Sequence, residues 1–202
     1  MNNTRHTSDT AQATSPRSNT RTGAQTGAQT GAQVVDRIAA QVISTPIGPL
    51  AVLVREGVLV AAGFTADPQE MFVRLPLHVQ AEGLRVVDDL DEVAKAVDAY
   101  FAGDLDALDA IPVEQPGTST RKQLHRALRE VKAGTTVTYA ELAEHAGLPR
   151  TAARAAGSAC AQNLIAPFVP CHRVLPSTGG FGGYYYGTPI KEWLLAHESG
   201  KI

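Results

Sequence analysis

Residues 138–157 have the sequence Thr-Tyr-Ala-Glu-Leu-Ala-Glu-His-Ala-Gly-Leu-Pro-Arg-Thr-Ala-Ala-Arg-Ala-Ala-Gly, and this stretch decides the fold of the second half of the chain. Thr138 and Glu141 have the spacing of a capping box, in which each side chain bonds the other residue's backbone N–H at a helix start. Gly147 and Pro149 then mark a turn, and the Ala-rich segment 150–161 predicts a second helix. Two helices joined by a glycine-containing turn predict a helix-turn-helix. An αα-hairpin with no role in DNA binding fits this pattern alone equally well.

The segments around this pattern predict further helices. Thr118 to Thr120 can cap a helix that runs to about Lys132, and Gly134 ends it. A short C-terminal helix is expected to start near Pro189 and to include Glu198. The second half is therefore expected to be mostly helical.

The first half predicts a small sheet. Apolar runs at 41–44, 50–54 and 58–62 are separated by turn signals and predict a β-meander. A short helix is predicted at 68–75, and the apolar period at 90–102 predicts a longer one.

Composition and charge divide the chain into three predicted parts. Residues 1–33 contain the sequence Thr-Gly-Ala-Gln three times in tandem and predict a disordered tail. Residues 34–115 form a predicted acidic domain of net charge −9, and residues 116–202 a predicted basic domain of net charge +5, in a chain of net charge −2. Such asymmetry indicates a polyanion that contacts only the second half, although chance placement of solvated charges would give the same count.

Cysteine usage and hydropathy indicate the compartment. The chain has two cysteines, Cys160 and Cys171, which form neither a disulfide framework nor a zinc spacing. No apolar run approaches the ~20 residues that span a membrane. We therefore expect a cytoplasmic protein that contacts no membrane and binds no metal.

Cys171 and His172 stand side by side in Pro-Cys-His-Arg-Val at 170–174. A thiol attacks as its thiolate, so a neighbouring base favours nucleophilic chemistry. A third group normally orients such a base, and Glu198 is a candidate. An inert buried cysteine is the alternative for any single cysteine.

Several spaced motifs resemble the O6-alkylguanine-DNA alkyltransferase family, whose members move an alkyl group from guanine onto their own cysteine. The resemblance runs from about Ile43 to Glu198, and its motifs are residues 44–50, 138–143, 152–157, Asn163, 170–174 and 191–198. It implies an α/β (α+β) fold: a small N-terminal β-sheet domain with ribonuclease-H-like topology, followed by a mostly helical C-terminal domain containing the helix-turn-helix.

The resemblance implies four catalytic residues. Cys171 is the alkyl acceptor, His172 the base that acts through a water, and Glu198 the residue that orients His172. Tyr139 donates a hydrogen bond to the departing guanine, which is chemically reasonable because negative charge develops on that base.

The resemblance also implies residues that bind DNA or support the site. Arg154 intrudes into the base stack and fills the place of a flipped nucleotide. Asn163 bonds backbone between the recognition helix and the cysteine segment, and Arg173 is structural or lies near a phosphate. Backbone carbonyls near Val174 contact the guanine amino group, and Lys191 lies on the O6 side of the pocket.

Three positions depart from the family pattern. Leu164 follows Asn163 where a proline is usual, and Cys160 occupies a pocket-wall position where it packs against the base or is a minor alkylation site. Tyr184, Tyr185 and Tyr186 occupy the substrate loop, where small residues are frequent. These tyrosines would stack on the base or narrow the pocket, and we expect a preference for methyl over bulky alkyl groups.

The expected function is repair of duplex DNA by a single-use transfer of an alkyl group, chiefly methyl, from O6 of guanine (also O4 of thymine) to Cys171. The substrate is double-stranded DNA containing O6-alkylguanine, the protein acts as a monomer, and no cofactor is required. Two alternatives stay open. A cysteine hydrolase built on Cys171, His172 and Glu198 would turn over repeatedly, and a non-catalytic lesion-sensing DNA-binding protein would accept no alkyl group.

Overall fold

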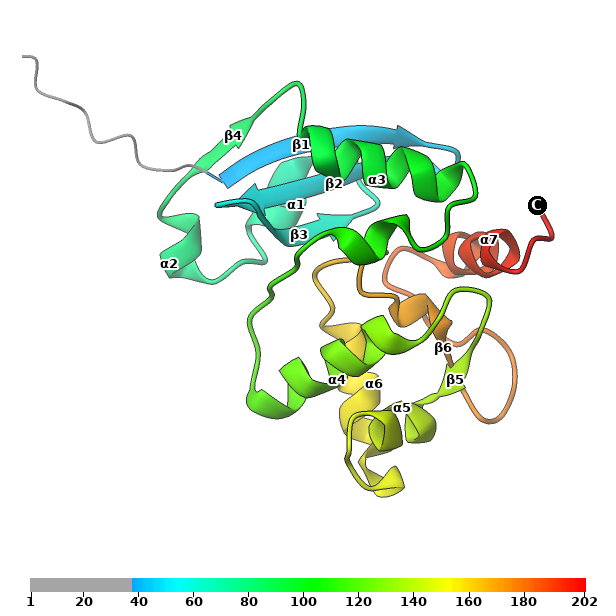
Figure 1. The fold of residues 1–202 in the computed structure, drawn as a ribbon. Coiled ribbons are helices and arrows are strands. Elements are labelled where there is room, and N and C mark those ends of the chain that lie inside the picture. Colours follow the sequence, from blue (N-terminus) through cyan, green and yellow to red (C-terminus); the bar gives the residue numbers. More distant parts are fainter. Residues whose placement is uncertain (1–37) are drawn as a thin grey trace, which may run out of the picture. The chain divides into compact units, whose positions relative to one another are not determined.

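A computed structural model describes residues 38–202, which belong to one compact unit (Figure 1). The predicted tail at 1–33 and the first residues of the predicted acidic domain, 34–37, lie outside the described residues. From residue 38 onward, no helix is both long enough and apolar enough to cross a membrane. The division of the chain after residue 115 stays a prediction. Below, residues 38–115 are the N-terminal part and residues 116–202 the C-terminal part.

The N-terminal part contains a four-stranded sheet in the order β3-β2-β1-β4. β1 (Ile38–Thr45), β2 (Gly48–Arg55) and β3 (Val58–Gly63) form an antiparallel meander, and β4 (Leu84–Val86) runs parallel to β1. The meander predicted from the three apolar runs is confirmed. β4 is only three residues long and gives no usable sequence signal.

Both faces of this sheet are covered. Residues 50–53 of β2 are buried at four consecutive positions, and successive strand side chains point to opposite faces. Figure 1 shows α3 (Asp91–Phe101) in front of the sheet and α1 (Pro68–Phe72) behind it. The sheet is therefore a fixed platform against which other segments can be held.

Several predicted boundaries in the N-terminal part need correction. The helix predicted at 68–75 ends at Phe72, and a second short helix, α2 (Leu77–Gln80), follows with Pro76 as its N-cap; Pro76 disfavours helical backbone at Leu75 and so keeps the two helices separate. The helix predicted at 90–102 is α3 and is one residue shorter at each end. The 3₁₀ helix η1 (Ala107–Ala110) is not predicted at all.

The C-terminal part is mostly helical, as predicted. Its elements are α4 (Ser119–Glu130), β5 (Val137–Thr138), α5 (Tyr139–His145), η2 (Arg150–Ala152), α6 (Ala153–Ala161), η3 (Cys171–Arg173), β6 (Val174–Leu175) and α7 (Thr188–Glu198). The predicted helix-turn-helix is α5 and α6, although the second helix begins as a 3₁₀ turn. α4 ends at Glu130, two residues before the predicted end, because Val131 adopts an extended conformation.

Two loop segments attach to β3. Residues 112–114 pair alongside Leu59, with the Glu114 amide donating to the Leu59 carbonyl at 3.0 Å. Residues 164–166 pair alongside Ala62, whose amide donates to the Leu164 carbonyl at 2.8 Å. β3 therefore holds in place both the chain that enters the C-terminal part and the chain that precedes Cys171.

The capping box at the start of α5 gives a stability prediction. The Thr138 hydroxyl accepts a hydrogen bond from the Glu141 amide at 3.2 Å, and the Glu141 carboxylate accepts one from the Thr138 amide at 2.6 Å. We expect Thr138→Ala to lower the free energy of unfolding by ~1 kcal/mol, measured by urea denaturation. Thr136→Ala, at an exposed position two residues away, is the matched control. Equal stability of the two variants would contradict this account of the helix start.

Candidate active site

Cys171 lies at the start of η3, in the wall of a cavity of about 310 Å³. The side chain is 9% exposed. The cavity is lined by residues from α5, α6, the segment before η3 and the loop before α7: Tyr139, Gly157, Cys160, Ala161, Asn163, Ala166, Cys171, Gly183, Tyr184, Tyr185 and Tyr186. The thiol therefore faces a space enclosed mainly by the helix-turn-helix and by residues 183–186, called the tyrosine loop below.

The Cys171 thiol is protonated at rest. Burial raises its pKa, and this effect outweighs the opposing hydrogen bond from Asn163 and the positive charge of Lys191. The Asn163 side-chain nitrogen lies 3.2 Å from Sγ and donates to it. A reaction at this sulfur therefore needs a base that removes the proton as the reaction begins.

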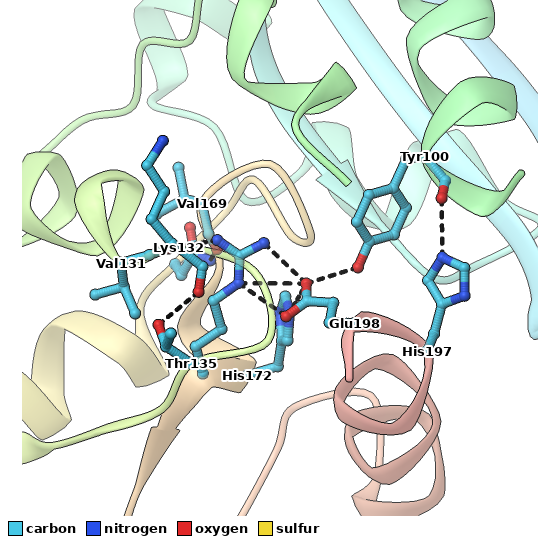
Figure 2. A network of polar contacts seen from close by, with 10 residues as sticks. Tyr100, Val131, Lys132, Thr135, Val169, His172, His197 and Glu198 are labelled. Atoms are coloured by element: carbon cyan, nitrogen blue, oxygen red, sulfur yellow. Dashed lines mark hydrogen bonds and ion pairs between the residues drawn. The ribbon is translucent and has the colours of Figure 1, made fainter. Parts of the chain in front are cut away.

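His172 and Glu198 are brought together, which the sequence alone could not show. Nε2 of His172 lies 2.8 Å from Oε1 of Glu198, and both side chains are fully buried. Glu198 also accepts hydrogen bonds from the Tyr100 hydroxyl at 2.8 Å and from the Arg173 guanidinium at 2.8–3.2 Å (Figure 2). Burial alone would raise the pKa of Glu198, but the hydrogen bonds and charges of His172 and Arg173 hold it well below its usual range.

The contact with Glu198 determines which nitrogen of the His172 imidazole carries the proton. An ionised Glu198 can only accept, so Nε2 of His172 carries the proton and Nδ1 is left as an acceptor. Burial lowers the pKa of His172, against the opposing effect of Glu198, so the ring is neutral. Within residues 38–202, Nδ1 is buried and has no hydrogen-bond partner. A neutral imidazole with a free acceptor nitrogen is the form that can take up a proton.

Arg173 and Lys191 are buried cations with structural contacts. Arg173 is 5% exposed and its guanidinium also donates to the Val131 carbonyl, so its placement fits the structural role and not a position near a phosphate. Nζ of Lys191 donates a hydrogen bond to the Val174 carbonyl at 2.8 Å. This carbonyl is the one expected to contact the guanine amino group, and in the structure it already has a donor. Burial lowers the pKa of Lys191, and the nearby thiols of Cys160 and Cys171 oppose this effect.

Tyr139 and Arg154 both belong to the helix-turn-helix, but only Tyr139 lines the cavity of Cys171. Tyr139 is the first residue of α5, and a Cβ built at Gly157 would lie 3.8 Å from its ring, so this turn of α6 packs against the tyrosine. Burial, together with the nearby thiols, raises the pKa of Tyr139, which keeps its hydroxyl a donor. Arg154 is exposed in the first turn of α6 and lines a separate cavity with Tyr139 and Thr178.

The tyrosine loop is attached to the N-terminal part. The Tyr186 hydroxyl lies 3.5 Å from the Ala62 carbonyl oxygen, and the Arg74 guanidinium lies 4.3 Å from the centre of the Tyr185 ring. The hydroxyl of Tyr184 is enclosed and has no partner among the described residues. Arg74 and Ala62 thus contact the tyrosine loop, and no sequence motif indicates these contacts.

The Glu198 network gives a prediction for stability against pH. The carboxyl has its ordinary pKa of 4.5 in the unfolded chain and a much lower pKa in the folded protein. The unfolded state therefore binds more protons below about pH 4.5, and the stabilisation present above that pH is lost as the pH falls. We expect Glu198→Gln to lower the free energy of unfolding at pH 7 by roughly 3 kcal/mol, because Arg173 stays buried without its counter-charge.

The same variant should lose less stability than the wild type between pH 5 and pH 3, measured by denaturant unfolding at each pH. Glu192→Gln, at an exposed position of α7, is the control and should follow the wild type. Parallel pH curves for Glu198→Gln and the wild type would refute the assignment.

Comparison with known proteins places this chain in a family. Two protein-family models match the chain. The family model for the ribonuclease-like domain of 6-O-methylguanine DNA methyltransferase matches residues 38–115, and the family model for its DNA binding domain matches residues 119–200. A methylated-DNA–protein-cysteine methyltransferase of Shigella flexneri is 36% identical over 165 residues, which are 80% of this chain and 96% of that protein.

Solved structures agree with the sequence comparison. The O6-methylguanine methyltransferase of Mycobacterium tuberculosis superposes with a TM-score of 0.66 at 30% identity, over 82% of this chain and 94% of that chain. The M. tuberculosis OGT in complex with DNA gives a TM-score of 0.68 at 29% identity, over 82% and 95% of the two chains. The expected fold class, a small N-terminal sheet and a helical C-terminal part, is confirmed by these structures. The chain belongs to the 6-O-methylguanine DNA methyltransferase family.

Proposed function

We propose that this protein repairs duplex DNA by transferring an alkyl group, chiefly methyl, from O6 of guanine to Sγ of Cys171. The observation that carries the proposal is the Cys171 thiol in a cavity wall next to the His172–Glu198 pair. Membership of a family whose models and relatives are named for this reaction supports it. O4-alkylthymine is a second substrate in the same proposal.

The reaction begins with loss of the thiol proton. His172 takes this proton at Nδ1 through a bridging water, while Glu198 fixes the ring through Nε2 and stabilises the imidazolium that forms. Asn163 donates to the sulfur as negative charge develops there. The need for an internal base follows from the burial of the thiol, which disfavours a free thiolate.

Alkyl transfer is an in-line displacement at the carbon attached to O6. A bond forms between Sγ and that carbon, the bond from the carbon to O6 breaks, and the bonding pair leaves with the guanine. Tyr139 donates a hydrogen bond to the departing base, whose negative charge spreads over O6 and the ring nitrogens. The product at Cys171 is a thioether, which no group in the cavity can cleave, so each molecule acts once.

DNA is the proposed partner of the C-terminal part. The O6 substituent lies inside a base-paired duplex, so the nucleotide must leave the stack to reach Cys171. Arg154, exposed on α6, fills the vacated position in the stack. The positive charge of residues 116–202 favours contact with phosphates, and binding should weaken with salt. In this proposal the protein acts as a monomer, inside the cell.

The acceptor assignment is tested by intact mass. We expect the protein to gain one methyl group after mixing with duplex DNA that contains O6-methylguanine, and the group to map to Cys171. Cys171→Ala should gain nothing and still bind DNA, because the alanine removes only the nucleophile. Cys160→Ala is the matched control and should react like the wild type. Methyl gain by Cys171→Ala would end the proposal, and continued product formation with excess DNA would favour a cysteine hydrolase.

The substrate preference is tested by comparing alkyl groups of different size. Because Tyr184, Tyr185 and Tyr186 all line the cavity, we expect O6-benzylguanine in DNA to react more slowly than O6-methylguanine, by on the order of tenfold. Tyr185→Ser should reduce this difference, because it removes an exposed ring from the cavity wall. Similar single-turnover rates for both groups in the wild type would show that the tyrosines do not restrict the pocket.

A further inference from the structure

We propose that Gln115 is a positioning residue for alkyl acceptance: its side-chain amide fixes the orientation of Asn163, so that Asn163 donates to the sulfur of Cys171. The inference rests on the proposed function in that it assumes Cys171 to be the acceptor. Gln115 belongs to none of the motifs that the sequence identifies. It lies at the end of the N-terminal part and is 7% exposed.

The Gln115 amide has one possible orientation. Its Oε1 accepts a hydrogen bond from the backbone amide of Leu164 at 2.9 Å, and a backbone amide can only donate. The opposite end of the side chain must therefore be the NH₂ group. Nε2 donates to Oδ1 of Asn163 at 3.0 Å.

This orientation determines that of Asn163. Oδ1 of Asn163 accepts from both Gln115 and the Ile165 amide at 3.1 Å. Nδ2 donates to the Val169 carbonyl at 2.7 Å and to Sγ of Cys171 at 3.2 Å. A flipped amide would set its NH₂ against two donors and its oxygen against the Val169 carbonyl. Gln115 and the backbone thus keep the donor end of Asn163 on the sulfur.

The backbone around the two amides is held by β3. Residues 112–114 and residues 164–166 are each hydrogen-bonded to this strand, at Leu59 and Ala62 respectively. Gln115 follows directly on the first segment and Asn163 directly precedes the second. The contact between the two amides is therefore fixed by the sheet.

The donor matters because Cys171 is buried. Burial disfavours the thiolate, and the hydrogen bond from Asn163 is the strongest opposing effect, followed by the positive charge of Lys191. The other ionisable side chains that lie close enough to act electrostatically with Cys171 are neutral at rest and carry no favourable charge: Cys160, Tyr139, Tyr184 and Tyr186. His172 follows Cys171 in η3 and is also neutral. Loss of the Asn163 donor would leave mainly Lys191 to stabilise the developing negative charge.

The first test measures thiol reactivity without DNA. Gln115→Met keeps a side chain of similar length but cannot hydrogen-bond to Asn163. In a Cys160→Ser background, the rate of Cys171 alkylation by iodoacetamide is measured from pH 6 to pH 10. We expect the midpoint of the profile to move to higher pH and the rate at pH 7.5 to fall on the order of tenfold. The single-turnover methyl transfer rate should fall by a similar factor, while affinity for undamaged DNA stays unchanged.

Two further variants separate positioning from a general loss of structure. Gln123→Met is the matched control, because the Gln123 side chain also hydrogen-bonds to the backbone, donating to the Ala146 carbonyl, and has no hydrogen bond to Asn163. It should keep the wild-type profile. Gln115→Glu keeps the shape of the side chain and sets a carboxylate oxygen against Oδ1 of Asn163, so its profile should move in the same direction as that of Gln115→Met. It serves as the test if the methionine variant does not fold.

A double-mutant cycle decides whether Gln115 acts through Asn163. In an Asn163→Ala protein, Gln115→Met should cause no further loss of thiol reactivity. Additive losses would overturn the proposal, as would a folded Gln115→Met or Gln115→Glu protein with the wild-type profile. If the iodoacetamide profiles shift as expected but the wild type takes no methyl group from DNA, the proposed function fails and the positioning role of Gln115 stands.

Discussion

Glu198 carries a negative charge in the interior, where an unpaired carboxylate would be strongly destabilising. Three donors make its burial possible, and they come from distant segments: Tyr100 from α3, and His172 and Arg173 from η3 (Figure 2). Because the charge requires all of these contacts, it fixes the end of α7 against both the cysteine segment and the N-terminal part. The position of the imidazole beside Cys171 depends on this one carboxylate.

Two buried acids in the same region have opposite pKa shifts, and the difference explains their roles. Burial raises the pKa of both Cys171 and Glu198. Glu198 overcomes this effect through several donors and a guanidinium, so it stays ionised. Cys171 has one side-chain donor, Asn163, and the positive charge of Lys191, which is bonded to the Val174 carbonyl, so it stays neutral. The site thus holds a permanent negative charge on Glu198, hydrogen-bonded to His172, and a neutral thiol on Cys171, as the proposed roles of orienting group and nucleophile require.

The fold followed from the sequence where the signal is local. The β-meander, the capping box at Thr138 and the glycine turn before α6 are each set by a few adjacent residues, and the structure has them where they are predicted. β4 and η1 are short and depend on tertiary contacts: β4 pairs with β1, and carbonyls of η1 accept hydrogen bonds from Arg129. The helix predicted at 68–75 is too long, and Pro76 explains only why Leu75 is not helical.

In the candidate site, too, local features could be predicted from the sequence and long-range contacts could not. The Cys171–His172 dipeptide is a local signal, and the family resemblance added Glu198, Tyr139, Arg154 and Asn163 as expectations. The contacts that orient these residues could not be predicted. Tyr100 and Glu198 are separated by 98 positions in the sequence, and no periodicity or motif connects them. A hydrogen bond of this kind exists only because two elements pack together, so the sequence of either element gives no sign of it.

These long-range contacts also give the N-terminal part a physical role. On the sequence alone it is an acidic domain without catalytic residues. In the structure it supplies a donor on each side of the reacting pair, because Tyr100 bonds the carboxylate behind His172 and Gln115 bonds the amide beside Cys171. Both donors depend on one fixed sheet: Tyr100 belongs to α3, which packs on it, and Gln115 follows a segment paired with β3. In the proposed reaction the imidazole and the amide donor must both be in place when the thiol proton is lost, and the sheet holds the contacts that orient both of them.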